Sequence, residues 1–283
     1  MKNIAIISNK SRDRSYAVTR EVYLRLSAMG FVCWLDGSAA ESILGAAGFD
    51  TLPDGTDLVI VVGGDGSMLD ASVQAIPRNI PMLGVNLGKV GYLTEVDPKD
   101  LDLLSCLLSG EYRIEEKMLL SAEVRRGDVT ERIDRRAVND VVISHDSFLG
   151  IAELLVEDSE RNALSYRADG LVVATPQGST AYSLSSGGPI VAHDVDGIIL
   201  TPVSPHSFFN RSVILNADDV LTVTNTGRGE VNVSIDGRLF ARLAEGDACV
   251  IRRAEERVKV LTFAGNSMFT NLFKKMRILE DID

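Results

Sequence analysis

LVIVVGGDGS, at residues 58–67, joins five apolar residues to three glycines, one aspartate and one hydroxyl. A run that is apolar on both faces is typical of a strand buried in a parallel sheet, and ligands of such sheets collect where the strands end. The glycines let backbone N–H groups approach a phosphate, and a helix that begins near Ser67 would point its positive end there. The stretch therefore predicts a buried strand, a turn suited to phosphate and a helix.

Asp65 is the unusual residue of this turn, because a carboxylate repels a phosphate unless it accepts a proton or faces a cation. It is a candidate general base for phosphoryl transfer, or a Mg²⁺ ligand. Asp and Gly are also common turn formers, so the stretch by itself leaves a plain turn open. The chain lacks GxxxxGK[ST], and no GxGxxG follows a strand, so a nucleotide would be held here in another way.

Outward from this stretch, the pattern changes once along the chain. Apolar runs such as residues 4–7 predict further buried strands, and residues 98–110 predict a helix. Over residues 1–112 this alternation predicts an α/β domain with an open, mostly parallel sheet. Over residues 113–262, short alternating or β-branched runs between turns predict an all-β, sandwich-like domain. The tail, 263–283, has apolar residues at helical spacing and is expected to pack back on the first domain.

Charge and composition exclude several classes of protein. With 40 acidic and 29 basic residues the net charge is −11, which disfavours nucleic acid and membrane surfaces as partners. No apolar run approaches the ~20 residues of a membrane span, and the first residues have a strand pattern without a leader. We therefore expect a soluble, cytoplasmic protein.

Cysteines and histidines predict neither a disulfide framework nor a metal site. The cysteines are widely spaced and are interpreted as reduced core residues: Cys33, Cys106 and Cys249. The histidines are in no ligand spacing: His145, His193 and His206. Of these, His206 is the one that could lie near a functional site.

Two further stretches are rich in polar groups. In VNDVVIS (138–144), Asn139 and Asp140 enter a predicted strand and could bind ribose hydroxyls or a base edge; an Asx turn is the alternative. In YRADGLVVATPQGSTAYSLSSGGPIV (166–191), Arg167 and Asp169 precede a buried strand, and a short hydroxyl-rich helix follows it. One helix cap uses one hydroxyl, so the excess favours a surface on which a planar base stacks.

VSIDGRL (233–239) places Asp236 and Arg238 at a hairpin turn, for which an ordinary surface turn is the favoured interpretation.

Taken in order, these blocks resemble the NAD kinase family, whose members phosphorylate the 2′-hydroxyl of the adenosine ribose of NAD. The resemblance runs from VVGGDGSMLDA through GVNLGKVGYLTEV, AVNDVVIS and DGLVVATPQGSTAYSLSSGGPIV to LTPVSPHSF. GGDG alone is shared with lipid kinases and a sugar-phosphate kinase family, whereas the combination of blocks is specific.

The resemblance implies a two-domain fold with an active site between the domains, and a homodimer or homotetramer. It implies that Asp65 accepts the proton of the ribose hydroxyl, that ATP, another nucleotide or polyphosphate is the donor, and that Mg²⁺ or another divalent cation assists. The implied NAD contacts are Asp65, Gly66, Asn139, Asp140, Arg167, Asp169, Thr180, Ala181, Tyr182, Ser183, Leu184, Ser185 and Arg238.

Four positions depart from the usual pattern of the family. Ser67 stands where Thr is frequent, Asp140 where Glu is frequent, and Arg238 where Gln is frequent. Ser212 stands where Pro is usual. Arg238 could favour a phosphorylated product or donor.

Two other functions stay open at this point. A lipid kinase with the same glycine turn would need an apolar acceptor groove and would give no role to the hydroxyl-rich stretch. A non-catalytic NAD(P)-binding regulator would use Asn139 and Thr180, but it would not need Asp65 in an intact glycine turn.

Overall fold

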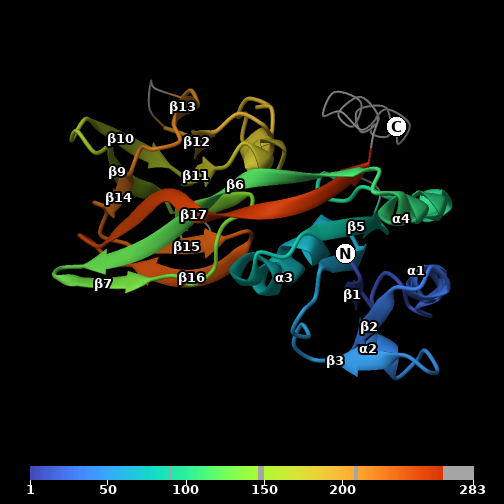
Figure 1. The fold of residues 1–283 in the computed structure, drawn as a ribbon. Helices are drawn as coiled ribbons and strands as arrows, with labels where there is room; N and C mark the ends of the chain where they lie inside the picture. Colours follow the sequence, from blue (N-terminus) through green and yellow to red (C-terminus); the bar gives the residue numbers. More distant parts are fainter. Residues whose placement is uncertain (89–90, 146–149, 207–209, 264–283) are drawn as a thin grey trace, which may run out of the picture. The chain divides into compact units, whose positions relative to one another are not determined.

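The structure, a computed structural model, describes residues 1–88, 91–145, 150–206 and 210–263 (Figure 1). The chain divides into two compact units. Unit 1 comprises Met1–Glu116 and the chain from Val258 onward, and unit 2 comprises Lys117–Arg257. The sequence analysis placed the boundaries at 112/113 and 262/263. Residues 264–283, predicted to pack on the first domain, lie outside the described residues.

A parallel sheet forms the centre of unit 1, as its buried apolar runs predict. In sheet order the strands are β5 (Met82–Asn86), β4 (Leu58–Gly63), β1 (Asn3–Ser8), β2 (Val32–Asp36) and β3 (Ala47–Phe49). Neighbouring strands in this order are parallel. All six residues of β4 are buried, so the strand that decides the fold is also central to the core. The end of β17 (Ala248–Phe263) pairs in parallel with β5.

Helices connect these strands, and one of them differs from the prediction. They are α1 (Ala17–Ala28), α2 (Gly37–Ala40), α3 (Asp65–Ala75), η1 (Ile76–Arg78), η2 (Pro98–Ser105) and α4 (Cys106–Ser109). Residues 98–110 form the 3₁₀ helix η2 and then the single turn α4, in place of one α-helix. Asp100 has φ −110° and ψ 23°, which lie outside helical geometry and interrupt the segment.

Two antiparallel sheets form unit 2. One contains β13 (Val213–Asn216), β12 (Gly197–Val203), β11 (Gly170–Ala174), β8 (Asp140–His145), β15 (Val231–Ile235) and β16 (Arg238–Leu243) in that order. The other contains β10 (Ala163–Ala168), β9 (Ala152–Glu157), β14 (Leu221–Asn225), the first part of β17, β6 (Tyr112–Arg126) and β7 (Val129–Arg132). One buried cluster takes Ile143 and Val233 from the first sheet and Val156 and Val223 from the second. The predicted fold class is confirmed.

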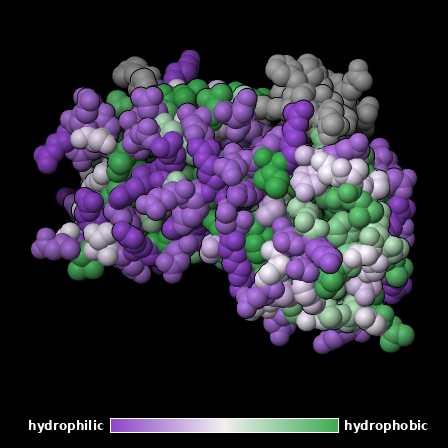
Figure 2. Space-filling view, viewed as in Figure 1, coloured by the Kyte–Doolittle hydropathy of each residue, from purple (hydrophilic) through white to green (hydrophobic). Residues whose placement is uncertain are grey.

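The surface is consistent with the charged composition. On the face in Figure 2, hydrophilic residues cover most of unit 2, and apolar residues are scattered among them.

The three cysteines are free; Cys33 and Cys249 are buried and Cys106 is half-buried. No helix in the described part of the chain is long and apolar enough to cross a membrane.

Candidate active site

The predicted strand, turn and helix are present at the end of β4. This strand ends at Gly63, and α3 begins at Asp65. A Cβ at Gly63 would lie 2.4 Å from Ser67 Oγ, so the turn is too tight for a side chain there. Gly66 is exposed, and a Cβ on it would meet nothing within 4 Å. Packing within the protein therefore explains Gly63 but not Gly66.

The carboxylate of Asp65 is held by two backbone donors. Tyr92 N–H donates to Oδ2 at 2.7 Å, and Leu93 N–H donates to Oδ1 at 2.9 Å. Each carboxylate oxygen has two lone pairs, so among the residues that the structure describes each keeps one acceptor position open. Burial raises the pKa of the Tyr92 phenol, and the charge of Asp65 raises it further, which keeps this phenol neutral. Asp65 is therefore fixed in orientation while it can still accept a proton.

Arg12 lies beside the glycine turn, which the sequence analysis missed. Its guanidinium carbon is 3.8 Å from the position that a Cβ on Gly64 would take, and its Nη1 donates to Leu87 O at 3.5 Å. Asn9 Nδ2 donates to Ser67 Oγ at 2.8 Å and ties the two loops together. The signal was available, because loops after neighbouring parallel strands share one edge of the sheet and SNKSR follows the first strand.

In unit 2, Asn139 and Asp140 lie at the start of β8, beside the hydroxyl-rich turn. This turn consists of η3 (Gln177–Thr180) and α5 (Tyr182–Ser185). Thr175 N–H donates to Asn139 O at 2.8 Å, and a Cβ on Gly178 would lie 2.0 Å from the same oxygen. The turn therefore packs directly on the backbone of Asn139.

Only part of the hydroxyl-rich stretch faces outward. Thr180 Oγ1 is buried and donates to Gln177 O at 3.2 Å, and buried Ser183 Oγ lies 3.0 Å from Thr201 Oγ1. The exposed or half-buried residues are Ala181, Tyr182, Leu184 and Ser185. The hydroxyls of Thr180 and Ser183 are therefore engaged inside the protein, which leaves the exposed ring of Tyr182 for stacking.

The carboxyl group of Asp140 is buried. The residue is 4% exposed, and no hydrogen bond to its carboxyl group is found within the described residues. Burial raises the pKa of this carboxyl to about 7, and the nearby charge of Asp236 adds to the effect. Buried polar groups are normally hydrogen-bonded, so the carboxyl of Asp140 is suited to bind a ligand hydroxyl.

The raised pKa makes a prediction for stability. Between the ordinary value of 3.8 and about 7, the folded protein binds more protons at Asp140 than the unfolded chain does. Asp140 therefore costs more stability as the pH rises through this window. We expect the free energy of unfolding of Asp140→Asn, relative to wild type, to increase from about pH 4 to about pH 8. Urea unfolding across this range measures it, and a difference independent of pH would contradict the expectation.

Asp169 lies at the opposite end of β8 from Asp140, and Arg167 belongs to β10 in the other sheet. Strand β11 runs antiparallel to β8, with Ala174 opposite Asp140. Asp169 O accepts the N–H of His145, the last of the six residues of β8, at 3.2 Å. Five steps along an antiparallel strand correspond to about 17 Å. The structure of unit 2 therefore separates the predicted residues into two groups.

The group around Arg167 has its own contacts. Arg167 Nε lies 3.1 Å from Glu153 Oε1, and His145 Nε2 lies 3.8 Å from Asp169 Oδ1. The N–H of His206 donates to Arg167 O at 2.7 Å, so His206 lies in this group. Both Arg167 and Asp169 keep substantial exposure, which leaves them accessible.

Arg238 belongs to the group around Asn139. Ile235 of β15 pairs with Val141 of β8 and with Arg238 of β16. The β15–β16 hairpin therefore turns at the end of the sheet where β8 begins. Arg238 is exposed. Asp236 is half-buried, and its carboxylate accepts hydrogen bonds from the backbone of residues 138–140, so it is more than the surface turn that the sequence suggested.

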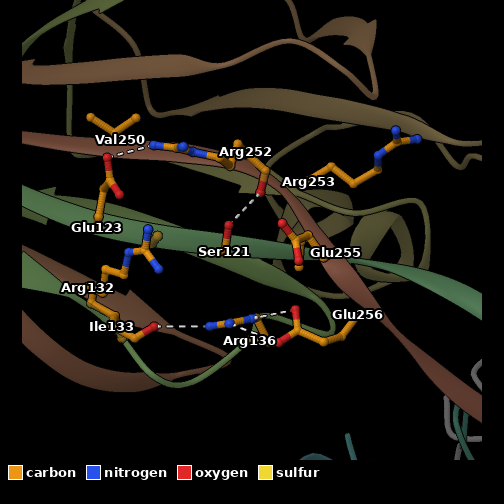
Figure 3. Close-up of a pocket in the computed structure, with 12 residues that line it drawn as sticks. Ser121, Glu123, Arg132, Ile133, Arg136, Val250, Arg252, Arg253, Glu255 and Glu256 are labelled. Atoms are coloured by element: carbon orange, nitrogen blue, oxygen red, sulfur yellow. Dashed lines mark hydrogen bonds and ion pairs between the residues drawn. The ribbon is translucent and has the colours of Figure 1, made fainter. Parts of the chain in front are cut away.

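Unit 2 also contains a separate cavity, and several of the charged side chains that line it pair with one another. It has a volume of about 260 Å³ and is lined mainly by β6 and β17, with none of the predicted site residues in its described lining (Figure 3). Two of its arginines contact two of its glutamates: Arg252 Nη2 lies 2.6 Å from Glu123 Oε1, and Arg136 makes two contacts of 3.0 Å with Glu256. The first pair joins β6 to β17, and the second joins the segment before β8 to β17.

Comparisons with known proteins find matches for both parts of the chain. Residues 4–112 match the ATP-NAD kinase N-terminal domain, and residues 138–263 match the ATP-NAD kinase C-terminal domain. The chain is 35% identical over 281 residues to the NAD kinase of Geobacter sulfurreducens, covering 98% of this chain and 99% of that one. It is 40% identical over 221 residues to the NAD kinase of Paraburkholderia phytofirmans, covering 78% and 73%.

Solved structures show the same fold. Yeast NADH kinase complexed with NADH has a TM-score of 0.87 at 23% identity, with 98% of this chain and 88% of that chain covered. An NAD kinase from Archaeoglobus fulgidus in complex with ATP has a TM-score of 0.71 at 22% identity, with 98% and 99% covered.

Proposed function

Because the chain belongs to the NAD kinase family, which phosphorylates NAD using ATP, we propose that it transfers the terminal phosphoryl group to the 2′-hydroxyl of the adenosine ribose. The observation that carries this proposal is the carboxylate of Asp65, oriented by the N–H groups of Tyr92 and Leu93 at the end of a central strand. Lipid kinase activity is disfavoured by the family matches on both units.

In the proposed reaction, the 2′-oxygen of the ribose attacks the terminal phosphorus of the donor, and Asp65 accepts the proton of that hydroxyl. The bond from that phosphorus to the bridging oxygen breaks, and the remainder of the donor leaves with the electron pair. Asp65 has the required acceptor positions because the two backbone donors occupy only half of its lone pairs. Such a base typically contributes ~10²–10⁴-fold to the rate.

The donor phosphates would bind at the glycine turn. The first turn of α3 directs its N–H groups there, exposed Gly66 leaves the backbone accessible, and Arg12 adds a positive charge. ATP is the donor that the family uses, and another nucleotide or polyphosphate is the alternative.

The residues present fit a divalent cation that is held largely by the donor. Mg²⁺ commonly takes one or two protein carboxylates together with substrate phosphates, and Asp65 offers one carboxylate with open acceptor positions. Among the described residues, no group of three or more His, Cys, Asp or Glu side chains could hold a metal by itself. When bound, the cation would supply charge neutralisation at the transferring phosphoryl group.

The acceptor would bind through the group around Asn139. The buried carboxyl of Asp140 would take a ribose hydroxyl, Asn139 precedes it in the chain, and the exposed ring of Tyr182 offers a stacking surface. Arg167, Asp169 and Arg238 are proposed as further contacts to the dinucleotide. We expect the protein to be cytoplasmic. We also expect a homodimer or homotetramer, and light scattering measures the mass of the assembly.

A coupled assay tests the activity. The protein is incubated with Mg²⁺ and NAD or NADH, with ATP or polyphosphate as donor, and the product is detected with an NADP-specific dehydrogenase. Formation of NADP supports the proposal and identifies the donor. Binding of NAD by calorimetry without product from any donor would instead favour a non-catalytic regulator.

The substitution Gly66→Ala distinguishes an effect on protein stability from an effect on binding of the donor phosphates. The added methyl meets no protein atom, and Ala favours a helix over Gly by about 1 kcal/mol, so the stability should be unchanged or higher. The methyl would stand where the phosphates approach, so we expect kcat/KM to fall by roughly tenfold or more. Urea unfolding and the coupled assay measure the two effects. The matched control is Gly229→Ala, whose methyl also meets nothing within 4 Å; equal activity of both variants would contradict the prediction.

A further inference from the structure

One carboxylate organises the backbone before β8. Asp236 Oδ1 accepts the N–H of Asn139 at 2.8 Å and that of Asp140 at 3.2 Å, and Oδ2 accepts the N–H of Val138 at 3.0 Å. In return, Asp236 N–H donates to Asp140 O at 3.0 Å. A single side chain from a distant hairpin therefore satisfies three consecutive donors.

Thr175 holds the same segment from the other side. Its hydroxyl donates to Val138 O at 2.6 Å, and its N–H donates to Asn139 O at 2.8 Å. Every backbone N–H and C=O of residues 138–140 has a partner from Asp236, Thr175 or the neighbouring strands, so this short segment has one defined conformation.

The turn itself does not require an acid at position 236. Asp236 has φ 48° and Gly237 has φ 76°, and Asn-Gly fits such a two-residue turn at least as well as Asp-Gly. An Asn side chain has one acceptor oxygen, whereas three N–H groups that approach from two directions need both oxygens of a carboxylate. The acid is also costly, because burial raises its pKa and Asp140 lies nearby. A group that serves only the turn would avoid this cost.

We propose that Asp236 is a positioning residue for the acceptor substrate. It fixes the backbone of residues 138–140, so that the side chains of Asn139 and Asp140 are held in the arrangement that binds the dinucleotide. This inference rests on the proposed function, in which Asn139 and Asp140 bind the acceptor.

The test compares Asp236→Asn with Asp219→Asn. Asn tolerates the left-handed conformation of position 236, so the hairpin should form, while its NH₂ group opposes one backbone donor. Asp219 is a matched control because it is another turn aspartate of unit 2, whose Oδ2 accepts Asn216 N–H at 3.0 Å. For Asp236→Asn we expect kcat/KM for NAD to fall roughly ten- to hundredfold, with KM for ATP within about twofold of wild type. The control should match wild type in both.

Amide hydrogen exchange gives a readout that does not depend on activity. Exchange at Val138, Asn139 and Asp140 should be faster in Asp236→Asn and unchanged in Asp219→Asn. If Asp236→Asn does not fold, Thr175→Val tests the same segment from the opposite side and should also raise KM for NAD while sparing KM for ATP.

The outcomes separate this inference from the proposed function. Unchanged kinetics for NAD in folded Asp236→Asn overturn it, as does an equal loss for NAD and ATP, which would indicate a general structural role. Asn139→Ala tests the acceptor site itself. If that variant binds NAD as wild type does, the acceptor site is wrong and the inference falls with it; if it loses affinity while Asp236→Asn does not, the inference alone is wrong.

Discussion

Asp65→Asn lowers kcat by roughly 10²–10⁴-fold and leaves KM for NAD within a few-fold of wild type. The reason is chemical, because an amide cannot take the proton of the ribose hydroxyl. The shape of the side chain is retained, and its one oxygen still accepts one of the two backbone N–H groups that hold Asp65. Ground-state binding of the dinucleotide should therefore persist while turnover is lost.

The measurement needs a check on stability. In Asp65→Asn, the new NH₂ group opposes a backbone donor from Tyr92 or Leu93, and an unsatisfied buried group costs about 1–3 kcal/mol. Urea unfolding identifies this cost, and single-turnover kinetics on the folded fraction give the chemical step. Asp54→Asn, in an exposed turn of unit 1, is the control and should behave as wild type. Turnover of Asp65→Asn near the wild-type rate would show that another group is the base.

Gly178→Ala should damage both stability and acceptor binding. A methyl there would lie 2.0 Å from Asn139 O and 2.5 Å from Asn139 C, which are backbone atoms with no rotamer to change. Overpacking of this kind costs typically 1–3 kcal/mol, and here it is relieved only if the turn and Asn139 move apart. Since a displacement of about 1 Å can cost 10²-fold in activity, we expect a loss of that order in kcat/KM for NAD.

Gly227→Ala is the matched control for this substitution. Its methyl would lie 3.4 Å from Glu153 Cβ, which is ordinary contact, so stability and kinetics should stay close to wild type. Urea unfolding and calorimetric titration with NAD measure both effects. Wild-type affinity for NAD in folded Gly178→Ala would mean that the contact between the turn and Asn139 does not shape the acceptor site.

The sequence predicts the fold class well because its signals are local. The apolar run of β4 and the glycines after it are adjacent in the chain, so a buried strand and a tight turn are visible without any tertiary information. The segment predicted as one helix at 98–110 is helical, but it consists of a 3₁₀ helix and one α-helical turn, and Asp100 leaves helical geometry, which apolar spacing does not reveal.

The candidate site is only partly predictable, for a physical reason. Asp65 and Asn139 were predicted from their own motifs. The proposed role of Asp236 instead depends on hydrogen bonds to residues 138–140, which precede it by 96 to 98 positions. Likewise, neighbouring motifs in the sequence can diverge in space, because a strand carries Asp169 and Thr175 to opposite ends of the sheet. Hydroxyl-rich composition also could not separate Ser183, which faces inward, from exposed Tyr182.

The path of β17 has a consequence for how the chain acquires its structure on the ribosome. The last part of this strand completes unit 1 by pairing Val260 with Met82, yet the whole of unit 2 is synthesised in between. The N-terminal half covers part of the β5 edge itself, because Val85 is bridged to Val96, but the Met82 end of the strand lacks its partner until residue 260 has been made. An open edge can recruit strands from other chains.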